Sequence, residues 1–388
     1  MKRTLWSKRA DARASDLSKR ADARASGLSE RADAHASGLS ERVNRAKLSK
    51  RASALWALAI VGCALAIPSL ASVSAAGNTT IRIGSLAPPG SSWDKVFRAW
   101  GNSLKQATGG AVQLQFFPGG VAGDERDVIR KMKLGQMDGG SFTSVGLGQV
   151  VRATAILQVP GIIETYKQLS YVREQMASDF EGMFQKEGYR LLGWGDVGFA
   201  RLFSKKPILK PDDYKSVRPW VPREDPFLPE LMKLIGANGI PLGIPEVFPA
   251  LQTGMVDTVP CSALAAVALQ WFRYVTHMSK NSEQTIVGAT IMREELFKTL
   301  APDYQKALFE TSKKAHAALI AQVQSEDAKA YKTLISRGII EFDPMATPEQ
   351  QALWKKVNDE LIKRMTGKLW SKELLQKVEK TAAATPKS

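Results

Sequence analysis

Residues 80–86 are the first clear alternation of apolar and polar positions, with Ile81 and Ile83 on one face, and this period of two predicts a β-strand. Residues 93–104 carry apolar side chains three and four positions apart, which predicts an amphipathic helix that stops at two glycines. The two patterns then alternate along the chain. They predict a strand at 112–117, a helix at 124–134 and a strand at 138–143.

This β-α-β-α-β order predicts an α/β fold in which a mostly parallel sheet is covered by helices on both faces. Ligands of such sheets bind at the carboxyl ends of the strands. The loops at 87–92 and 141–146 follow two of these strands and are the expected ligand-binding loops.

The middle of the chain repeats the pattern, with strand candidates at 189–193, 217–221 and 256–259, and predicts a second α/β lobe. A long helical pattern covers 301–337 and ends at Gly338. Thr347-Pro348-Glu349-Gln350 is typical of a capped helix start with proline at the first helical position. We expect these last helices to be scaffold.

The net charge of the 388 residues is +16, but it is unevenly distributed. Residues 1–52 carry 14 Lys and Arg against 6 Asp and Glu, a net +8, and contain an 11-residue repeat that begins at Ser7, Ser18 and Ser29. This basic low-complexity segment is either a surface-seeking arm or an unstructured extension, which could also precede the true start of translation. The remaining net charge of +8 is spread over residues 53–388, and this density is too low to indicate a groove that binds nucleic acid.

Residues 53–76 have the parts of a cleavable signal peptide. Basic residues precede an apolar run that ends at Pro68, and small residues around Ala75 fit a cleavage site. We therefore expect export to the periplasm and a mature chain that begins near Gly77. An alternative is lipid attachment at Cys63, because Ile60-Val61-Gly62-Cys63 is similar to a lipoprotein box.

The mature chain offers little catalytic chemistry. Cys261 is its only cysteine and stands in an apolar context, so we expect a buried side chain and no disulfide. His277 and His316 have no partner at metal-ligand spacing, which argues against a metal site. No dinucleotide fingerprint or P-loop is present, so we expect no cofactor and no enzymatic activity.

Several motifs, in order, resemble the DctP-type solute-binding subunit of tripartite ATP-independent periplasmic (TRAP) transporters. They are Leu86-Ala87-Pro88-Pro89-Gly90-Ser91-Ser92-Trp93, Thr108-Gly109-Gly110-Ala111-Val112, Phe117-Pro118-Gly119-Gly120, Gly135-Gln136-Met137-Asp138 and Glu246-Val247-Phe248-Pro249-Ala250-Leu251-Gln252-Thr253-Gly254-Met255-Val256-Asp257. The similarity spans roughly residues 81–361.

The resemblance implies a two-lobed periplasmic binding protein fold with hinge strands and a long connecting helix. Lobe I would comprise 77–199, lobe II 200–286, and parts of 287–388 would return to both, with the long helix at 301–337. It also implies capture of a small organic solute by hinge closure, delivery to the small and large membrane subunits of a TRAP permease, and no catalysis.

One departure from the family concerns its carboxylate-binding arginine. The resemblance implies that this arginine falls in Lys215-Ser216-Val217-Arg218-Pro219-Trp220-Val221-Pro222, where Trp220 occupies the position. The sequence thus resembles a subgroup of the family that lacks the usual carboxylate-binding arginine. Arg218 would share a strand face with Trp220 by period two and could form a shifted clamp, although Pro219 makes regular pairing doubtful. Arg201 stands beside another arginine position of the family and is either a ligand contact or a surface ion pair.

Tryptophan in place of arginine, with Val259 and Pro260 where polar residues are usual, predicts a pocket that favours apolar surface. We expect a hydrophobic or amphipathic solute gripped by Phe142 from one lobe and Trp220 from the other. Further candidate ligand-binding residues are Ser91, Trp93, Trp194, Pro260 and Trp271, with Arg201 or Arg218 for a polar end. The alternatives are a conventional dicarboxylate binder that uses those arginines, or a receptor serving a sensor or a lipid-handling route.

Overall fold

The computed structural model describes residues 78–280 and 284–386. The helices are α2 (Ser92–Ala107), α3 (Glu125–Lys133), α4 (Ser144–Val150), α5 (Tyr166–Gln175), α6 (Ala177–Lys186), α7 (Leu228–Ile235), α8 (Ile244–Thr253), α9 (Ala263–Ala268), α10 (Glu294–Thr299), α11 (Pro302–Ser336), α12 (Pro348–Met365) and α13 (Lys372–Ala383), with 3₁₀ turns η1 (Arg152–Gln158), η2 (Pro211–Ser216) and η3 (Trp271–Tyr274). The strands are β1 (Thr79–Ser85), β2 (Val112–Phe117), β3 (Gly139–Thr143), β4 (Tyr189–Trp194), β5 (Gly198–Phe199), β6 (Arg201–Ser204), β7 (Trp220–Pro222), β8 (Ile240–Leu242), β9 (Thr258–Cys261), β10 (His277–Ser279), β11 (Thr285–Ile286), β12 (Gly288–Arg293) and β13 (Ile340–Phe342). The expected extension at 1–52, the signal peptide at 53–76 and the lipoprotein cysteine Cys63 lie outside the described residues.

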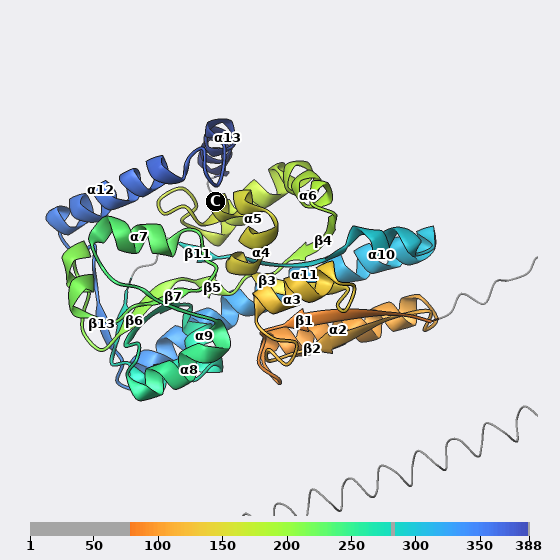
Figure 1. Cartoon of the computed structure of the whole chain (residues 1–388), viewed down its shortest axis with the longest axis horizontal. Helices are drawn as coiled ribbons and strands as arrows, with labels where there is room; N and C mark the ends of the chain where they lie inside the picture. Colours follow the sequence, from red (N-terminus) through yellow and green to blue (C-terminus); the bar gives the residue numbers. More distant parts are fainter. Residues whose placement is uncertain (1–77, 281–283, 387–388) are drawn as a thin grey trace, which may run out of the picture. The chain divides into compact units, whose positions relative to one another are not determined.

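The first sheet has the order β2-β1-β3-β12-β4 (Figure 1). The pairs β1–β2 and β1–β3 are parallel, as the β-α-β-α-β pattern predicted. Strand β12 comes from the far end of the chain and inserts antiparallel between β3 and β4. Gly139 allows this close insertion, because a Cβ there would lie 2.5 Å from the carbonyl oxygen of Ile291. The sheet is therefore mixed, and the expectation of a mostly parallel sheet holds only for its first three strands.

The ends of the helices that flank β1 and β3 are set by local side-chain caps. Ser91 caps α2, and its side chain accepts a hydrogen bond from the backbone nitrogen of Asp94. Asp124 caps α3 by accepting from the backbone nitrogen of Arg126 at 2.9 Å. Such caps satisfy backbone N–H groups that have no partner within the helix. They fix where each helix begins and hence where its loop runs over the sheet.

A second sheet has the order β13-β10-β6-β9, and β7 and β8 form a separate parallel pair. In this second sheet β6 is antiparallel to β9 and β10, whereas β10 and β13 are parallel. The strand predicted at 217–221 is shorter and later than expected. It starts at Trp220, because Pro219 has no backbone N–H and forms only an isolated bridge to Thr258.

The connections between the two sheets run through a short antiparallel pair, β5 and β11, in which Phe199 lies opposite Thr285. The 35-residue helix α11 packs against α2 and β4 on one side of this crossing and against α9 on the other. Its extent matches the helix predicted at 301–337. Buried side chains from β1, α2, α8, α9 and α11 belong to one continuous apolar cluster, and a second cluster lies under α4, α5, α6 and α13.

Candidate functional site: an apolar cavity with two carboxyl groups

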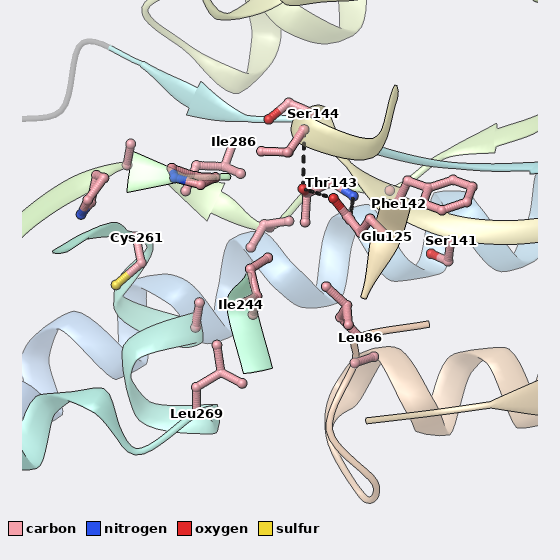
Figure 2. A pocket seen from close by; sticks show the side chains of 18 of the residues that line it. Leu86, Glu125, Ser141, Phe142, Thr143, Ser144, Ile244, Cys261, Leu269 and Ile286 are labelled. Atoms are coloured by element: carbon pink, nitrogen blue, oxygen red, sulfur yellow. Dashed lines mark hydrogen bonds between the residues drawn. The ribbon is translucent and has the colours of Figure 1, made fainter. Parts of the chain in front are cut away.

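A cavity of about 190 Å³ lies where the loops after β1 and β3 meet β7, β9 and α9 (Figure 2). Both loops expected from the sequence line it, with Leu86, Ala87 and Pro88 from one and residues 141–145 from the other. Most of the lining is apolar. Its six aromatic side chains are Trp93, Phe97, Phe142, Trp220, Phe227 and Trp271.

Trp220 and Trp271 pack against each other in this lining. The two indole rings meet edge to face with centroids 5.2 Å apart. The Nε1 of Trp220 donates to the carbonyl oxygen of Leu242 at 2.9 Å, so its only polar atom is satisfied away from the cavity. Trp220 is 4% exposed. At the position where the family resemblance places an arginine, the cavity wall is thus a fixed apolar surface.

Phe142 lies on β3, and its ring occupies space left by two glycines. A Cβ on Gly140 would lie 2.2 Å from the ring, and one on Gly146 would lie 2.7 Å from it. The ring is therefore held in the core that surrounds β3 and contributes to the cavity from a buried position. Trp93 lines the cavity from α2, and its Nε1 donates to the carbonyl oxygen of Asp196 at 3.1 Å.

Five of the nine ligand-binding residues expected from the sequence come together around the cavity: Trp93, Phe142, Trp220, Pro260 and Trp271. The other four lie outside its lining. Ser91 is occupied as the cap of α2. Trp194 packs edge to face on Phe180, with centroids 5.5 Å apart, and carries the Arg173 guanidinium above its ring at 4.7 Å.

The two candidate arginines are held by other partners. Arg218 pairs with the Asp257 carboxylate at 3.1 Å, and its side chain is 56% exposed. Its period-two relation to Trp220 fails because the strand begins only at Trp220. Arg201 donates from Nη1 to the backbone oxygens of Ser279, at 3.0 Å, and of Lys280, and its guanidinium stacks 4.2 Å from the Tyr331 ring.

The polar part of the cavity centres on Glu125, the first residue of α3. One carboxylate oxygen accepts from the backbone nitrogen of Thr143 at 2.5 Å. The other accepts from the Thr143 hydroxyl at 2.9 Å and the backbone nitrogen of Gly146 at 2.8 Å (Figure 2). Glu125 is 4% exposed. Burial raises the pKa of Glu125 to about 7, although these hydrogen bonds favour its ionised form.

Asp225 is a second carboxyl group in the lining. Its Oδ1 accepts from the backbone nitrogens of Phe227 at 2.6 Å and Leu228 at 2.8 Å, which holds the turn before α7. Burial raises the pKa of Asp225 above its ordinary value. Among the described residues that line the cavity there is no lysine and no arginine.

Sequence reasoning missed both carboxyl groups. Glu125 was interpreted only as part of a charged helix, because three acidic residues and Arg126 stand together at 124–127. The signal that could have found it is its place in the first turn of the helix after β2, directly ahead of the strand whose loop was expected to bind ligand. Cys261, expected to be buried, lines the cavity at 4% exposure, and burial raises the pKa of its thiol.

Within the described ranges, no group of three or more His, Cys, Asp or Glu residues could hold a metal ion. Of the helices in the described part of the chain, none is both long and apolar enough to cross a membrane.

Comparison with known proteins identifies the family. Residues 83–368 match the profile of DctP, bacterial extracellular solute-binding protein family 7, and the chain belongs to this family. It is an extracytoplasmic solute-binding protein of the TRAP type. It is 26% identical over 320 residues to the sialic acid-binding periplasmic protein SiaP of Vibrio cholerae, covering 79% of this chain and 96% of SiaP.

Two further comparisons agree. The C4-dicarboxylate-binding periplasmic protein DctP of Rhodobacter capsulatus is 24% identical over 314 residues, covering 78% of this chain and 90% of that protein. Among solved structures, the galactonate complex of the sugar acid binding protein DctPAm from Advenella mimigardefordensis superposes with a TM-score of 0.74 at 16% identity. It covers 80% of this chain and 99% of that one. At this identity the superposition establishes the fold: the two-lobed TRAP periplasmic binding protein architecture.

Proposed function

We propose that this protein captures a hydrophobic or amphipathic organic solute between two lobes and presents it to the membrane subunits of a TRAP permease. The observation that carries the proposal is the composition of the cavity, where six aromatic side chains and many aliphatic ones face a space with no basic residue among the described lining. Apolar surface contributes roughly 25 cal/mol per Å² buried, so such a lining favours apolar solutes.

The proposed lobes are 77–199 and 200–286, joined by the β5–β11 crossing and the long helix, with later segments returning to each. Closure requires that the solute touch both. Phe142 lines the cavity from β3 and Trp220 from β7, so they supply the two sides. The protein would act in the periplasm after cleavage at the end of the signal peptide at 53–76, and it would have no catalytic role.

A carboxylated solute is the second candidate, because relatives and structural neighbours are named for such ligands. One neighbour, from Ralstonia eutropha, is described with bound (S)-2-acetolactate at TM-score 0.72 and 20% identity, covering 78% of this chain and 98% of that one. For this chain the candidate would require Arg218 or Arg201 to leave Asp257 or the Ser279 carbonyl oxygen and reach the cavity.

Native mass spectrometry of the mature protein from its own periplasm, followed by denaturing extraction, tests the proposal. A co-purified apolar or amphipathic molecule is the expected result. A co-purified sugar acid or dicarboxylate, or thermal stabilisation by galactonate or succinate, would overturn it in favour of the second candidate. Affinity capture of the TRAP membrane subunits by the loaded protein tests the transport partner separately from a sensor or lipid-handling role.

A further inference from the structure

Glu125 stands apart from the other buried carboxylates near the first sheet because no cation accompanies it. Its three hydrogen bonds come from two backbone nitrogens and one hydroxyl. None of the ion pairs found within the described ranges includes Glu125. A buried carboxyl group without a countercharge is costly to ionise, and a ligand that supplies a positive or donor group removes part of that cost.

Two basic residues beside Glu125, one next to it in sequence and one in the lining of an adjoining cavity, are engaged by other carboxylates. A smaller cavity of about 20 Å³ adjoins the main one, and Glu125 lines both. Arg223 lines this smaller cavity and pairs with Glu246 at 2.5 Å. Arg126 pairs with Glu224 at 3.1 Å. Neither is among the residues that line the main cavity, so the charge facing a solute there comes from carboxyl groups.

Glu125 also keeps capacity for one more donor. An ionised carboxylate oxygen accepts about two hydrogen bonds, and the oxygen that accepts from the Thr143 nitrogen has only that one partner among residues 78–280 and 284–386. At Asp225, Oδ1 accepts both backbone hydrogen bonds, which leaves Oδ2 for a donor. Both carboxyl groups belong to the lining of the same cavity, whose remaining polar side chains are neutral.

We propose that the solute carries a hydrogen-bond donor or a cation at its polar end, such as a primary amine, and that Glu125 receives this group, with Asp225 adding charge of the same sign. This rests on the proposed function, in which the rest of the solute is apolar. A carboxylate at the same place would meet two groups that repel it whenever they are ionised, and no lysine or arginine among the described lining residues. The site therefore selects against the ligand class for which several relatives of this chain are named.

A matched series of probes tests the inference on the mature protein: 3-phenylpropylamine, 3-phenylpropan-1-ol and 3-phenylpropanoate, which share one apolar body. Isothermal titration calorimetry near neutral pH compares their affinities. We expect the amine to bind at least tenfold more tightly than the carboxylate, with the alcohol between them. Equal affinities for the three, or tightest binding by the carboxylate, would overturn the inference. Equal affinities would leave the apolar site of the proposed function standing.

Glu125→Gln and Asp225→Asn test the assignment of the receiving group, with far-ultraviolet circular dichroism as a check on folding. Glu125→Gln should abolish the amine's advantage over the alcohol, because the two probes share one apolar body and a neutral amide no longer favours the cation. Glu187→Gln removes the same charge from an exposed residue outside the cavity and should retain the full preference. An amine preference that persists in both cavity variants would refute the role of these carboxyl groups.

Failure of the proposed function has a different signature. If none of the three probes binds at millimolar concentration while galactonate or succinate does, the cavity does not recognise an apolar body, and both proposals fall together.

Discussion

Glu125, the first residue of α3, and Asp138, which follows the helix and precedes β3, are two buried carboxyl groups that differ in what surrounds them. Asp138 receives the guanidinium groups of Arg82, at 2.7 Å, and Arg293, at 3.3 Å. Burial pushes the pKa of Asp138 upward, but the hydrogen bonds and charge of Arg82 outweigh it, and the pKa lies below its ordinary value. Glu125 has only neutral donors, and burial raises its pKa to about 7.

The difference separates a structural carboxylate from one available to a ligand. Asp138 joins β1 to the start of β3 and to β12, and its charge is neutralised within the protein. Glu125 borders a cavity, and its charge is unmatched by any basic residue in the described lining. The presence of arginine beside Asp138, and its absence beside Glu125 in the described cavity lining, therefore separates the structural carboxylate from the one that can bind a ligand. The predictions below test this contrast, from the largest expected effect to the smallest.

Asp138→Asn should lower the free energy of unfolding by about 3 kcal/mol, because the buried Asp138 carboxylate is the shared partner of both Arg82 and Arg293. Urea denaturation of the mature protein measures this loss. Glu295 is the other carboxylate partner of Arg293, and its side chain is 85% exposed. Glu295→Gln should therefore change the free energy of unfolding by less than about 0.5 kcal/mol. Similar losses in the two variants would contradict the buried role of Asp138.

The stability contribution of Glu125 should fall as the pH rises. Because its folded pKa is near 7 and the ordinary value is 4.5, the native state binds more protons between these values, and the free energy of unfolding decreases through this window. The loss amounts to roughly 3 kcal/mol for a shift of this size. Denaturation at several pH values, in the wild type and in Glu125→Gln, measures it as a difference.

His316 changes stability in the opposite sense over an overlapping range, so the wild-type curve alone does not isolate Glu125. Burial lowers the pKa of His316 to about 4, and its contribution to stability is lost as the pH falls from its ordinary value of 6.5 toward that value. The Glu125→Gln variant keeps the pH dependence that His316 contributes to the free energy of unfolding and loses only the part contributed by Glu125. Parallel curves for the two proteins would rule out a raised Glu125 pKa.

Trp220→Ala should weaken binding of 3-phenylpropan-1-ol at least tenfold, about 1.4 kcal/mol, since it removes the largest flat surface of the β7 wall. Trp220→Phe is the conservative control. It loses the hydrogen bond to the Leu242 carbonyl oxygen but keeps an aromatic wall, and it should bind within a few-fold of the wild type. Unchanged affinity in folded Trp220→Ala would contradict the placement of the solute against β7.

Trp220→Arg should shift preference toward the carboxylate probe by roughly fivefold, because a guanidinium at this position would bring to the cavity the basic group that its described lining lacks. The ratio of 3-phenylpropanoate to 3-phenylpropan-1-ol affinity measures the shift. A ratio equal to that of the wild type would count against the correspondence between Trp220 and the family arginine.

Arg218→Ala should have the smallest effect and change the affinity for any of the three probes by less than about twofold. Its guanidinium is more than half exposed and pairs with Asp257 outside the cavity lining. A large loss of carboxylate binding in this variant would restore the shifted-clamp hypothesis.

The local elements of the first sheet were predictable because each carries its own period and its own cap. Ile81 and Ile83 alternate as a strand does, and Asp124 caps the helix that follows β2. The insertion of β12 was not predictable in this way. Its partners on β3 lie about 150 residues away in sequence, and no local pattern records an antiparallel pairing at that separation.

The residues of the candidate site also divide into those that the sequence predicted and those that it did not. Trp220 was found because a family motif runs through it, and the loops were found because parallel strands place their carboxyl ends together. The period-two relation between Arg218 and Trp220 does not hold, because it requires a continuous strand and β7 begins only at Trp220, after Pro219. Glu125 was missed because its sequence context is that of a solvated helix start, whereas in the fold α3 packs against β3 and α4 and Glu125 is 4% exposed.

Helix α11 limits which movements the elements packed against it can make. At 1.5 Å per residue its 35 residues form a strut about 50 Å long, and an intact helix neither shortens nor stretches appreciably. It contacts α2 and β4 of the first sheet and lies against α9 at the end of β9. Elements fastened to one strut keep their spacing along its axis. In the proposed closure, the freedom left to these elements is therefore rotation and not separation along this axis.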